Sequence, residues 1–301
     1  MTRPGSDRQA PDRQARDRQA RDLPLDAHLH TDLSPDSRVP IDVYARQAVE
    51  RGIAELAITD HVDFDPGAPA YAFTTFEQRE RTVREAAERW AERGVTVRFG
   101  VEITWDQRWA EDIARHIATH AYDFVIGSVH IYRESPYAAP NVAGWVTGKP
   151  LAEIVAPYFE EVERAARSGL FDALGHLDFV KRYLVPHVPP TALAAAPELY
   201  EPILRALVES GTALEINTSG LRQGPAETYP PPAIVARYRQ LGGRAITIGS
   251  DAHEADSFAA DLDQGYAAAV AAGFEALTLR GGAASRSVPI PARAPEAAGT
   301  T

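Results

Sequence analysis

The chain has 301 residues, of which 45% are hydrophobic, and its formal net charge is −11 with no polybasic run. This length is enough for one large core, and an α/β barrel of ~250 residues is commonly a single domain. The acidic balance disfavours nucleic-acid partners, because phosphate backbones are bound by clustered Lys and Arg. The absence of cysteine excludes disulfides, thiolate ligands and cysteine nucleophiles. Any metal must therefore be held by His, Asp or Glu.

The composition of both ends of the chain predicts segments outside the folded domain. Residues 1–22 repeat Asp-Arg-Gln-Ala imperfectly and carry almost no large apolar side chain, so they cannot offset the entropy of ordering. Residues 287–301 are rich in Pro, Ala and Gly. We predict a disordered N-terminal tail at 1–22, a folded domain at 23–286 and a flexible C-terminal tail at 287–301. No apolar stretch approaches ~18 residues and no hydrophobic signal core begins the chain, so we expect a cytoplasmic protein without a membrane partner.

Between these tails, short apolar runs alternate with segments of helical periodicity. The predicted strands, in chain order, are 23–30, 53–61, 95–105, 124–132, 171–180, 213–219 and 245–253. The predicted helices fall near 40–51, 75–93, 107–120, 150–168, 191–210, 231–241 and 257–272. Seven βα units with strands buried on both faces predict a parallel barrel. An open doubly wound sheet is the alternative, which is weakened because no Gly-rich phosphate loop follows any strand.

Six of the nine histidines fall at or near the C-terminal ends of predicted strands. These six are His28, His30, His61, His130, His176 and His253. The two units without a histidine supply acidic or amide side chains instead, namely Glu102 and the pair Glu215 and Asn217. Because all strand C-termini of a barrel point to one rim, where barrel active sites gather, we expect these side chains to converge.

Side-chain parity strengthens this expectation. Side chains alternate along a strand, so His28 and His30 face the same way, as do Asp251 and His253. A single strand-end histidine is more often a packed side chain than a ligand, but six placed in this way are improbable by chance. Imidazole with carboxylate suits Zn²⁺, Mn²⁺ or Fe²⁺ and suits Ca²⁺ or Mg²⁺ poorly.

The remaining three histidines fit structural roles better. His116 and His120 lie four residues apart on the third predicted helix, but no Glu follows His116 as in the HExxH zinc motif. We therefore expect a surface pair far from the rim. His187 lies in the Pro-rich loop PHVPP, where a packing role is favoured.

Seven segments, in their order and spacing, resemble the PHP (polymerase and histidinol phosphatase) superfamily. They are HLHTDLSPDS, TDH, GVE, IGSVH, GHLDFVKRY, EINTSGLR and GSDAH. The likeness covers about residues 24–280, and GHLDFVKRY and EINTSGLR look most like the monofunctional histidinol phosphatases. The resemblance implies a distorted seven-stranded (β/α)7 barrel, a single domain, that holds three divalent transition-metal ions (Zn, Fe or Mn).

The resemblance also implies which residues hold each ion. The first ion would be held by His28, His30, Glu102 and Asp251. Glu102 would bridge to the second ion, completed by His130 and His176. The third ion would be held by Asp36, His61 and His253. This chain departs from the family in two places: many members have His in place of Asp36, and the segment 133–149 does not match the family's usual residues.

A phosphate monoester also needs donors from the protein. Arg222 and Arg182 follow the sixth and fifth predicted strands, and an arginine fork matches phosphate geometry. Ser37, Lys181 and Asn217 are further candidates for binding the substrate. A metal-bridged water loses its proton near neutral pH and can attack phosphorus. The leaving alcohol then needs a proton, for which Asp251 and a metal-bound water are both candidates.

The function that the resemblance implies is hydrolysis of L-histidinol phosphate to L-histidinol and phosphate, a step of histidine biosynthesis. The alternative within the family is a phosphoesterase for another small phosphomonoester or a nucleotide, with segment 133–149 carrying the difference. An amidohydrolase barrel also begins with HxH, but it has eight units and places Lys or His on later strands. A non-catalytic metal-binding scaffold is disfavoured, since every expected ligand position holds a competent residue.

Overall fold

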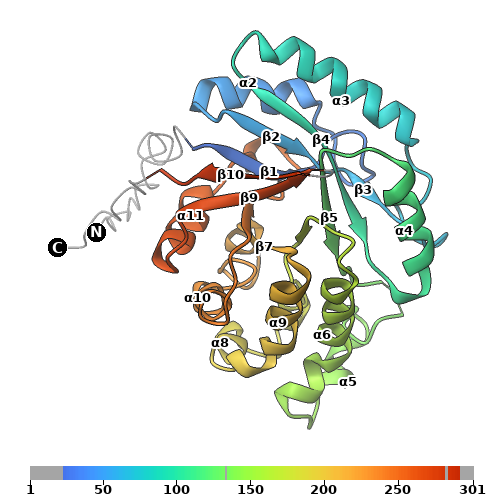
Figure 1. Ribbon diagram of the computed structural model, residues 1–301. Helices are drawn as coiled ribbons and strands as arrows, with labels where there is room; N and C mark the ends of the chain where they lie inside the picture. Colours follow the sequence, from blue (N-terminus) through green and yellow to red (C-terminus); the bar gives the residue numbers. More distant parts are fainter. Residues whose placement is uncertain (1–22, 133, 282–283, 292–301) are drawn as a thin grey trace, which may run out of the picture.

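The computed structural model describes residues 23–132, 134–281 and 284–291. Seven parallel strands form a nearly closed barrel with helices around its outside (Figure 1). Their order around the barrel is β1 (Leu25–Leu29), β2 (Glu55–Ile58), β4 (Thr96–Thr104), β5 (Phe124–Ser128), β6 (Ala173–Leu174), β7 (Ala213–Asn217) and β8 (Ile246–Gly249). The two-residue β3 (His61–Val62) pairs with the carboxyl-terminal half of β4. The predicted single-domain (β/α)7 barrel is confirmed.

The barrel closes where β1 meets β8. Leu29 and Ala252 form a parallel bridge there, and the amide of His30 donates to the carbonyl of Ala252 at 3.0 Å. The hydroxyl of Tyr44 lies 3.0 Å from the carbonyl oxygen of His30 and 3.1 Å from that of Ala252. This seam brings the end of the first strand beside the end of the last, so the HxH and DxH motifs face each other.

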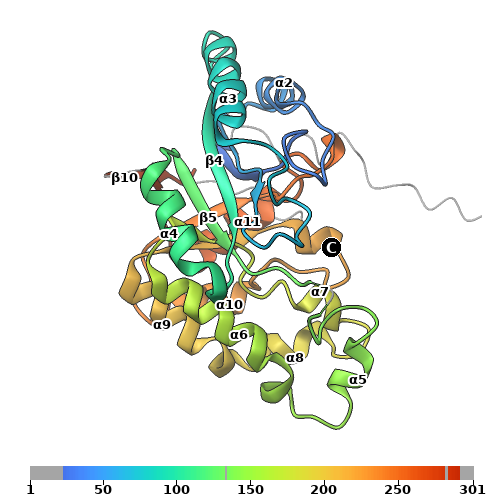
Figure 2. The same ribbon diagram turned by 90° about the vertical axis from the view of Figure 1, so that its right-hand side faces the viewer.

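Seven helices follow the barrel strands, as the apolar periodicity predicts. They are α2 (Ile41–Arg51), α3 (Phe76–Ala91), α4 (Ala110–Thr119), α6 (Leu151–Ser168), α9 (Glu201–Ser210), α10 (Pro232–Gln240) and α11 (Leu262–Ala271). The helices α2, α3, α6 and α11 pack on barrel strands, and α6 and α9 lie side by side (Figure 2). Gly52 and Gly169 end α2 and α6 with φ of 69° and 63°, the left-handed conformation that glycine adopts without strain.

The loops contain short elements that periodicity does not reveal. These are α5 (Val142–Val146), α7 (Lys181–Leu184) and α8 (Pro190–Ala194). The helix predicted at 191–210 is divided into α8 and α9, because Pro197 cannot continue the hydrogen-bond ladder of a helix and begins a short 3-10 turn instead. The strand predicted at 171–180 is also shorter than expected: β6 ends at Leu174, and residues 177–180 form a turn.

An antiparallel hairpin of β9 (Ala276–Gly281) and β10 (Ala284–Pro289) follows the last barrel helix. Arg286 pairs with Glu55, the first residue of β2, so the hairpin lies at the amino-terminal end of the barrel, opposite the rim. The C-terminal tail predicted from Ser287 therefore begins too early, because β10 continues to Pro289 and the side chain of Ile290 is buried. The predicted tail at 1–22 and residues 292–301 lie outside the described residues. No helix in the described part of the chain has the length and apolar character needed to cross a bilayer.

Candidate metal centre

The buried carboxylate of Glu102, on β4, lies at the centre of the rim. Its two oxygens lie between 2.8 and 3.3 Å from ring nitrogens of five histidines. Oε2 faces His28, His30 and His61. Oε1 faces His130 and His176. Glu102 and these five histidines come from five of the seven predicted βα units, and their side chains meet at one place.

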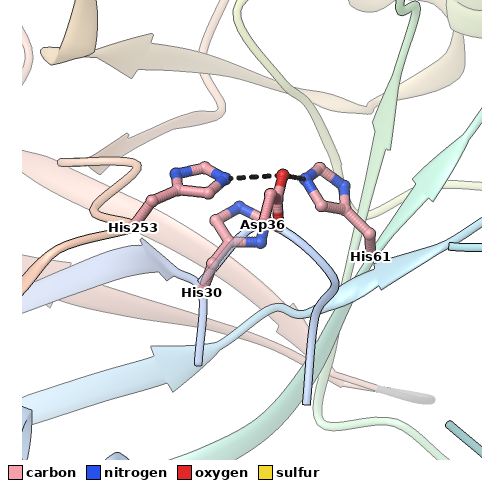
Figure 3. A group of neighbouring side chains, drawn as sticks. All are labelled: His30, Asp36, His61 and His253. Carbon is pink, nitrogen blue, oxygen red and sulfur yellow. Dashed lines mark ion pairs between the residues drawn. The ribbon is translucent and has the colours of Figure 1, made fainter. Parts of the chain in front are cut away.

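Two further carboxylates extend the group towards the seam. Asp251 Oδ1 lies 3.4 Å from His30 Nε2 and 3.4 Å from His253 Nδ1. Figure 3 shows Asp36 between His61 and His253, with its Oδ2 3.1 and 3.2 Å from their Nε2 atoms. The ring of His30 lies beside this carboxylate. All the ligands that the resemblance implies therefore meet at one place.

We call these nine residues the cluster: His28, His30, Asp36, His61, Glu102, His130, His176, Asp251 and His253. Within the described residues, their ligand atoms form four overlapping groups, each with all atoms within 4.8 Å of one another. His28 Nε2 and His30 Nε2 lie only 3.0 Å apart. Glu102 Oε2 is buried without a hydrogen-bond donor among the described residues. A cation bound here would separate the two imidazole nitrogens and give the buried carboxylate oxygen a partner, so the donor set fits divalent metal ions.

The charges in the cluster favour the ligand forms of its carboxylates. Burial raises the pKa of Glu102, but the positive charges of His61 and His28 outweigh it and hold that pKa well below its ordinary value. Burial also raises the pKa of Asp251, and His28 and His30 bring it well below the ordinary range. Both carboxylates are therefore anions across neutral pH, which is the form that binds metal.

Two cluster residues have left-handed backbones. His176 has a φ of 23° and Asp251 a φ of 52°. Such conformations cost a non-glycine residue energy and concentrate at functional sites. His176 lies in the turn that follows β6, and its Nε2 is 2.8 Å from Glu102 Oε1. The mistaken strand prediction at 171–180 thus concerns the residues that make this turn.

A cavity of about 1210 Å³ opens above the cluster. The loops that follow β1, β3, β4, β5, β6, β7 and β8 form its walls. Arg182 and Arg222 line it, as predicted, and so does Arg108, which sequence reasoning did not single out. The guanidinium of Arg222 donates to the carbonyls of Ser250 at 2.6 Å and Ala260 at 3.3 Å, which fixes its direction.

The three other predicted substrate contacts lie behind this wall. Ser37 Oγ lies 3.0 and 2.9 Å from the backbone carbonyl oxygens of His30 and His253. The ammonium of Lys181 is buried between the carboxylates of Asp178 and Glu227, each at 2.8 Å. Their polar atoms are thus engaged inside the protein, and neither side chain lines the cavity in the part of the chain that is described.

Asn217 has a similar place beneath the cluster. Its amide lies 3.1 Å from Glu215 and 3.3 Å from Asp251. Ser219, which sequence reasoning missed, both lines the cavity and lies 3.2 Å from Asp251 Oδ2. Ser219 lies at the end of the strand predicted at 213–219, and this rim position is the signal in the sequence that could have identified it.

Arg79, another residue that the sequence did not indicate, supports the cluster from the side. It is buried on α3, and its guanidinium donates to the carbonyls of His61 and Thr74. No local pattern distinguishes it from the other arginines of that helix. His116 on α4 and His120, which ends that helix, lie outside the cavity as predicted, but both are half-buried and not surface residues. His116 Nε2 is 2.9 Å from the hydroxyl of Tyr122.

Comparison with known proteins agrees with this geometry. The profile of the PHP domain matches residues 26–219. A protein named probable histidinol-phosphatase from Deinococcus radiodurans is 32% identical over 231 residues, covering 76% of this chain and 86% of the relative. One of the same name from Thermotoga maritima is 29% identical over 240 residues, covering 80% and 88%. The crystal structure of histidinol phosphate phosphatase from Lactococcus lactis with zinc, L-histidinol and phosphate is 25% identical, has a TM-score of 0.75, and aligns with 88% of this chain and 99% of its own. The chain therefore belongs to the PHP domain family.

Proposed function

We propose that this protein is a metal-dependent phosphatase that hydrolyses L-histidinol phosphate to L-histidinol and phosphate. The observation that carries the proposal is a buried carboxylate, Glu102, surrounded by five imidazoles at the floor of a cavity with arginines in its walls. The names of the relatives and the histidinol and phosphate in the Lactococcus lactis structure support the choice of substrate.

The cluster is proposed to hold three divalent ions. His28, His30, Glu102 and Asp251 would bind the first, and Glu102 would be shared with the second, bound also by His130 and His176. Asp36, His61 and His253 would bind the third. Zinc is supported by the Lactococcus lactis structure, and the same donors suit iron and manganese. When bound, such ions act as Lewis acids towards phosphate oxygens and lower the pKa of water from about 15.7 to roughly 7.

Side chains of the protein would bind the phosphate and handle the proton that the leaving alcohol needs. Arg222 and Arg182 bind the non-bridging oxygens of the phosphate and neutralise the charge that develops on them. The leaving alcohol needs a proton, and Asp251, which lines the cavity, and a water on the metal are the two candidates to supply it. Ser219, 3.2 Å from Asp251 Oδ2, holds this carboxylate in place.

The outer wall of the cavity suits a substrate that carries positive charge. Asp63, Asp65 and Glu134 line it beyond the cluster. Asp65 is paired with Arg108 at 2.9 Å, so among the described residues of this wall Asp63 and Glu134 leave a net negative charge. L-Histidinol phosphate presents an amine and an imidazole on the side away from its phosphate, whereas a nucleotide presents further phosphates or neutral sugar. This wall favours histidinol phosphate over the alternative of a nucleotide.

The proposal is tested by phosphate release from the zinc-loaded protein with a panel of monoesters at equal concentration. The panel contains L-histidinol phosphate, p-nitrophenyl phosphate, a sugar phosphate and a nucleoside monophosphate. We expect the highest kcat/KM for L-histidinol phosphate. A higher value for the nucleoside monophosphate or the sugar phosphate would assign the protein to another substrate of the family, and no release from any ester would contradict phosphatase activity.

A further inference from the structure

Glu215, on β7, is a fully buried carboxylate directly beneath the cluster. Three donors converge on it. His28 Nδ1 lies 2.6 Å from Oε1, the backbone amide of His176 donates to Oε2 at 2.8 Å, and Asn217 Nδ2 donates to the same oxygen at 3.1 Å. It does not belong to the four ligand groups found among the described residues. Its place suggests a role that acts through its neighbours.

The contact with His28 fixes where that ring carries its proton. An ionised carboxylate can only accept hydrogen bonds, so the proton of the short contact must sit on Nδ1 of His28. The opposite nitrogen, Nε2, is then the one left to bind a cation, and it faces Glu102 and His30 at 3.3 and 3.0 Å. A carboxylate behind a metal-binding histidine commonly sets the tautomer and the direction of the ring in this way.

The second oxygen connects the other side of the cluster. It accepts the amide of His176 at the point where the backbone is left-handed, with a φ of 23°. It also accepts from Asn217, whose Nδ2 lies 3.3 Å from Asp251 Oδ2. One carboxylate on β7 is therefore connected to cluster residues from β1, from the turn after β6 and from the end of β8.

The neighbouring strands leave space for this carboxylate. A Cβ on Gly249 would lie 3.0 Å from Glu215 Oε1 and 2.2 Å from the Cβ of His28. A Cβ on Gly175 would lie 2.5 Å from the hydroxyl of Ser128 and 3.4 Å from Glu215 Oε2. The glycine at position 249, at the end of β8, is what allows His28 and Glu215 to approach so closely.

We propose that Glu215 is a positioning residue of the metal centre, which sets the tautomer of His28 and holds His176 in its turn. The role rests on the proposed metal-dependent function. Glutamine is the discriminating substitution because it keeps the shape but has only one acceptor oxygen. If that oxygen faces His28, the amide NH₂ meets the donors of His176 and Asn217. If it faces His176, the NH₂ donates to Nδ1 of His28 and forces the proton onto Nε2, the nitrogen meant for metal.

The experiment measures zinc affinity by competition with a chromophoric chelator for the wild type, Glu215→Gln and the control Asp172→Asn. Asp172 is a carboxylate at the start of β6 whose Oδ2 accepts the amide of Val125 at 2.9 Å. We expect zinc to bind about 10- to 100-fold more weakly to Glu215→Gln, as for other residues that orient metal ligands. We expect kcat to recover in part at saturating zinc and the control to match the wild type. Wild-type zinc affinity in a folded Glu215→Gln protein would overturn the proposal.

A second measurement does not depend on the variant folding. In the zinc-loaded wild type with ¹⁵N-labelled histidine, the His28 signal should show a protonated Nδ1 and a metal-bound Nε2. A His28 with the proton on Nε2 would overturn the role of Glu215. A wild type that neither binds zinc nor releases phosphate would instead contradict the proposed function, so the two failures are distinguishable.

Discussion

The exchange of Glu102 for glutamine is the most informative single perturbation of the cluster. Glu102 carries the one carboxylate that all five surrounding imidazoles share, and its oxygens are buried. Glutamine keeps the volume and one acceptor but removes the negative charge. Any cation between Glu102 and its histidines loses its closest anionic ligand.

The size of the loss follows from the distances. A unit charge 3.3 Å from Oε2, the separation of His28 Nε2, interacts with the carboxylate by about 5 kcal/mol at an effective dielectric constant of ~20. This energy corresponds to a metal affinity more than about 1,000-fold weaker, because each 1.4 kcal/mol is a factor of ten. Because the carboxylate is proposed to be shared by two ions, we expect Glu102→Gln to lose metal as well as phosphatase activity.

The assay combines elemental analysis of the purified protein with steady-state phosphate release, and its control is His116→Ala. His116 lies on α4 outside the cavity, so its loss should leave metal content and kcat/KM unchanged. Similar metal content and activity in the two variants would refute the assignment of Glu102 as the central ligand.

Three other predictions follow from the structure. The Arg222→Ala variant should keep its metal but have a kcat/KM ~30- to 1,000-fold lower than the wild type, and phosphate should inhibit it more weakly. The Arg222→Lys variant should recover part of the loss. If Arg222→Ala also loses metal, Arg222 instead supports the loop that carries Asp251. Deleting residues 1–22 removes no cluster residue, so turnover and melting temperature should stay unchanged, and a large fall in either would refute this. Burial and the neighbouring His120 lower the pKa of His116 from 6.5 to about 4. As the pH falls from 6.5 to 4, this histidine is protonated in the unfolded chain but not in the folded protein, so the free energy of unfolding should decrease over that range. His116→Gln should show a shallower fall in melting temperature over that range, and an equal fall would contradict it.

The sequence predicted the parts of the fold that follow from local periodicity. Alternation along β1 placed His28 and His30 on one face, and the structure brings their Nε2 atoms together. Asp251 and His253 also meet this group, but the strand predicted at 245–253 ends at Gly249 and Asp251 has a left-handed backbone, so alternation along a strand is not the reason. The seven βα units were visible because apolar runs alternate with segments of helical periodicity, although β6 itself has only two residues. The position of the cluster at the rim then followed from barrel geometry.

The failures arose where contacts distant in sequence decide the structure. The run LGHLDFV alternates like a strand, yet the hydrogen bond from His176 to Glu215, 39 residues away, stabilises a turn. Lys181 looked like a phosphate ligand, but Glu227, 46 residues away, and Asp178 bind its ammonium. The Pro-rich C-terminal segment resembled a tail, although pairing with β9 places Ser287–Pro289 in an edge strand, where proline is tolerated.

The claim that divalent metal on this rim drives phosphate-ester hydrolysis is tested most directly by a zinc titration of the chelated protein. Metal content and the rate of phosphate release from L-histidinol phosphate are measured at each addition. We expect the metal-free protein to be inactive and its rate to rise in step with bound zinc until the cluster is filled. Full activity in protein shown by elemental analysis to contain no metal would contradict the account.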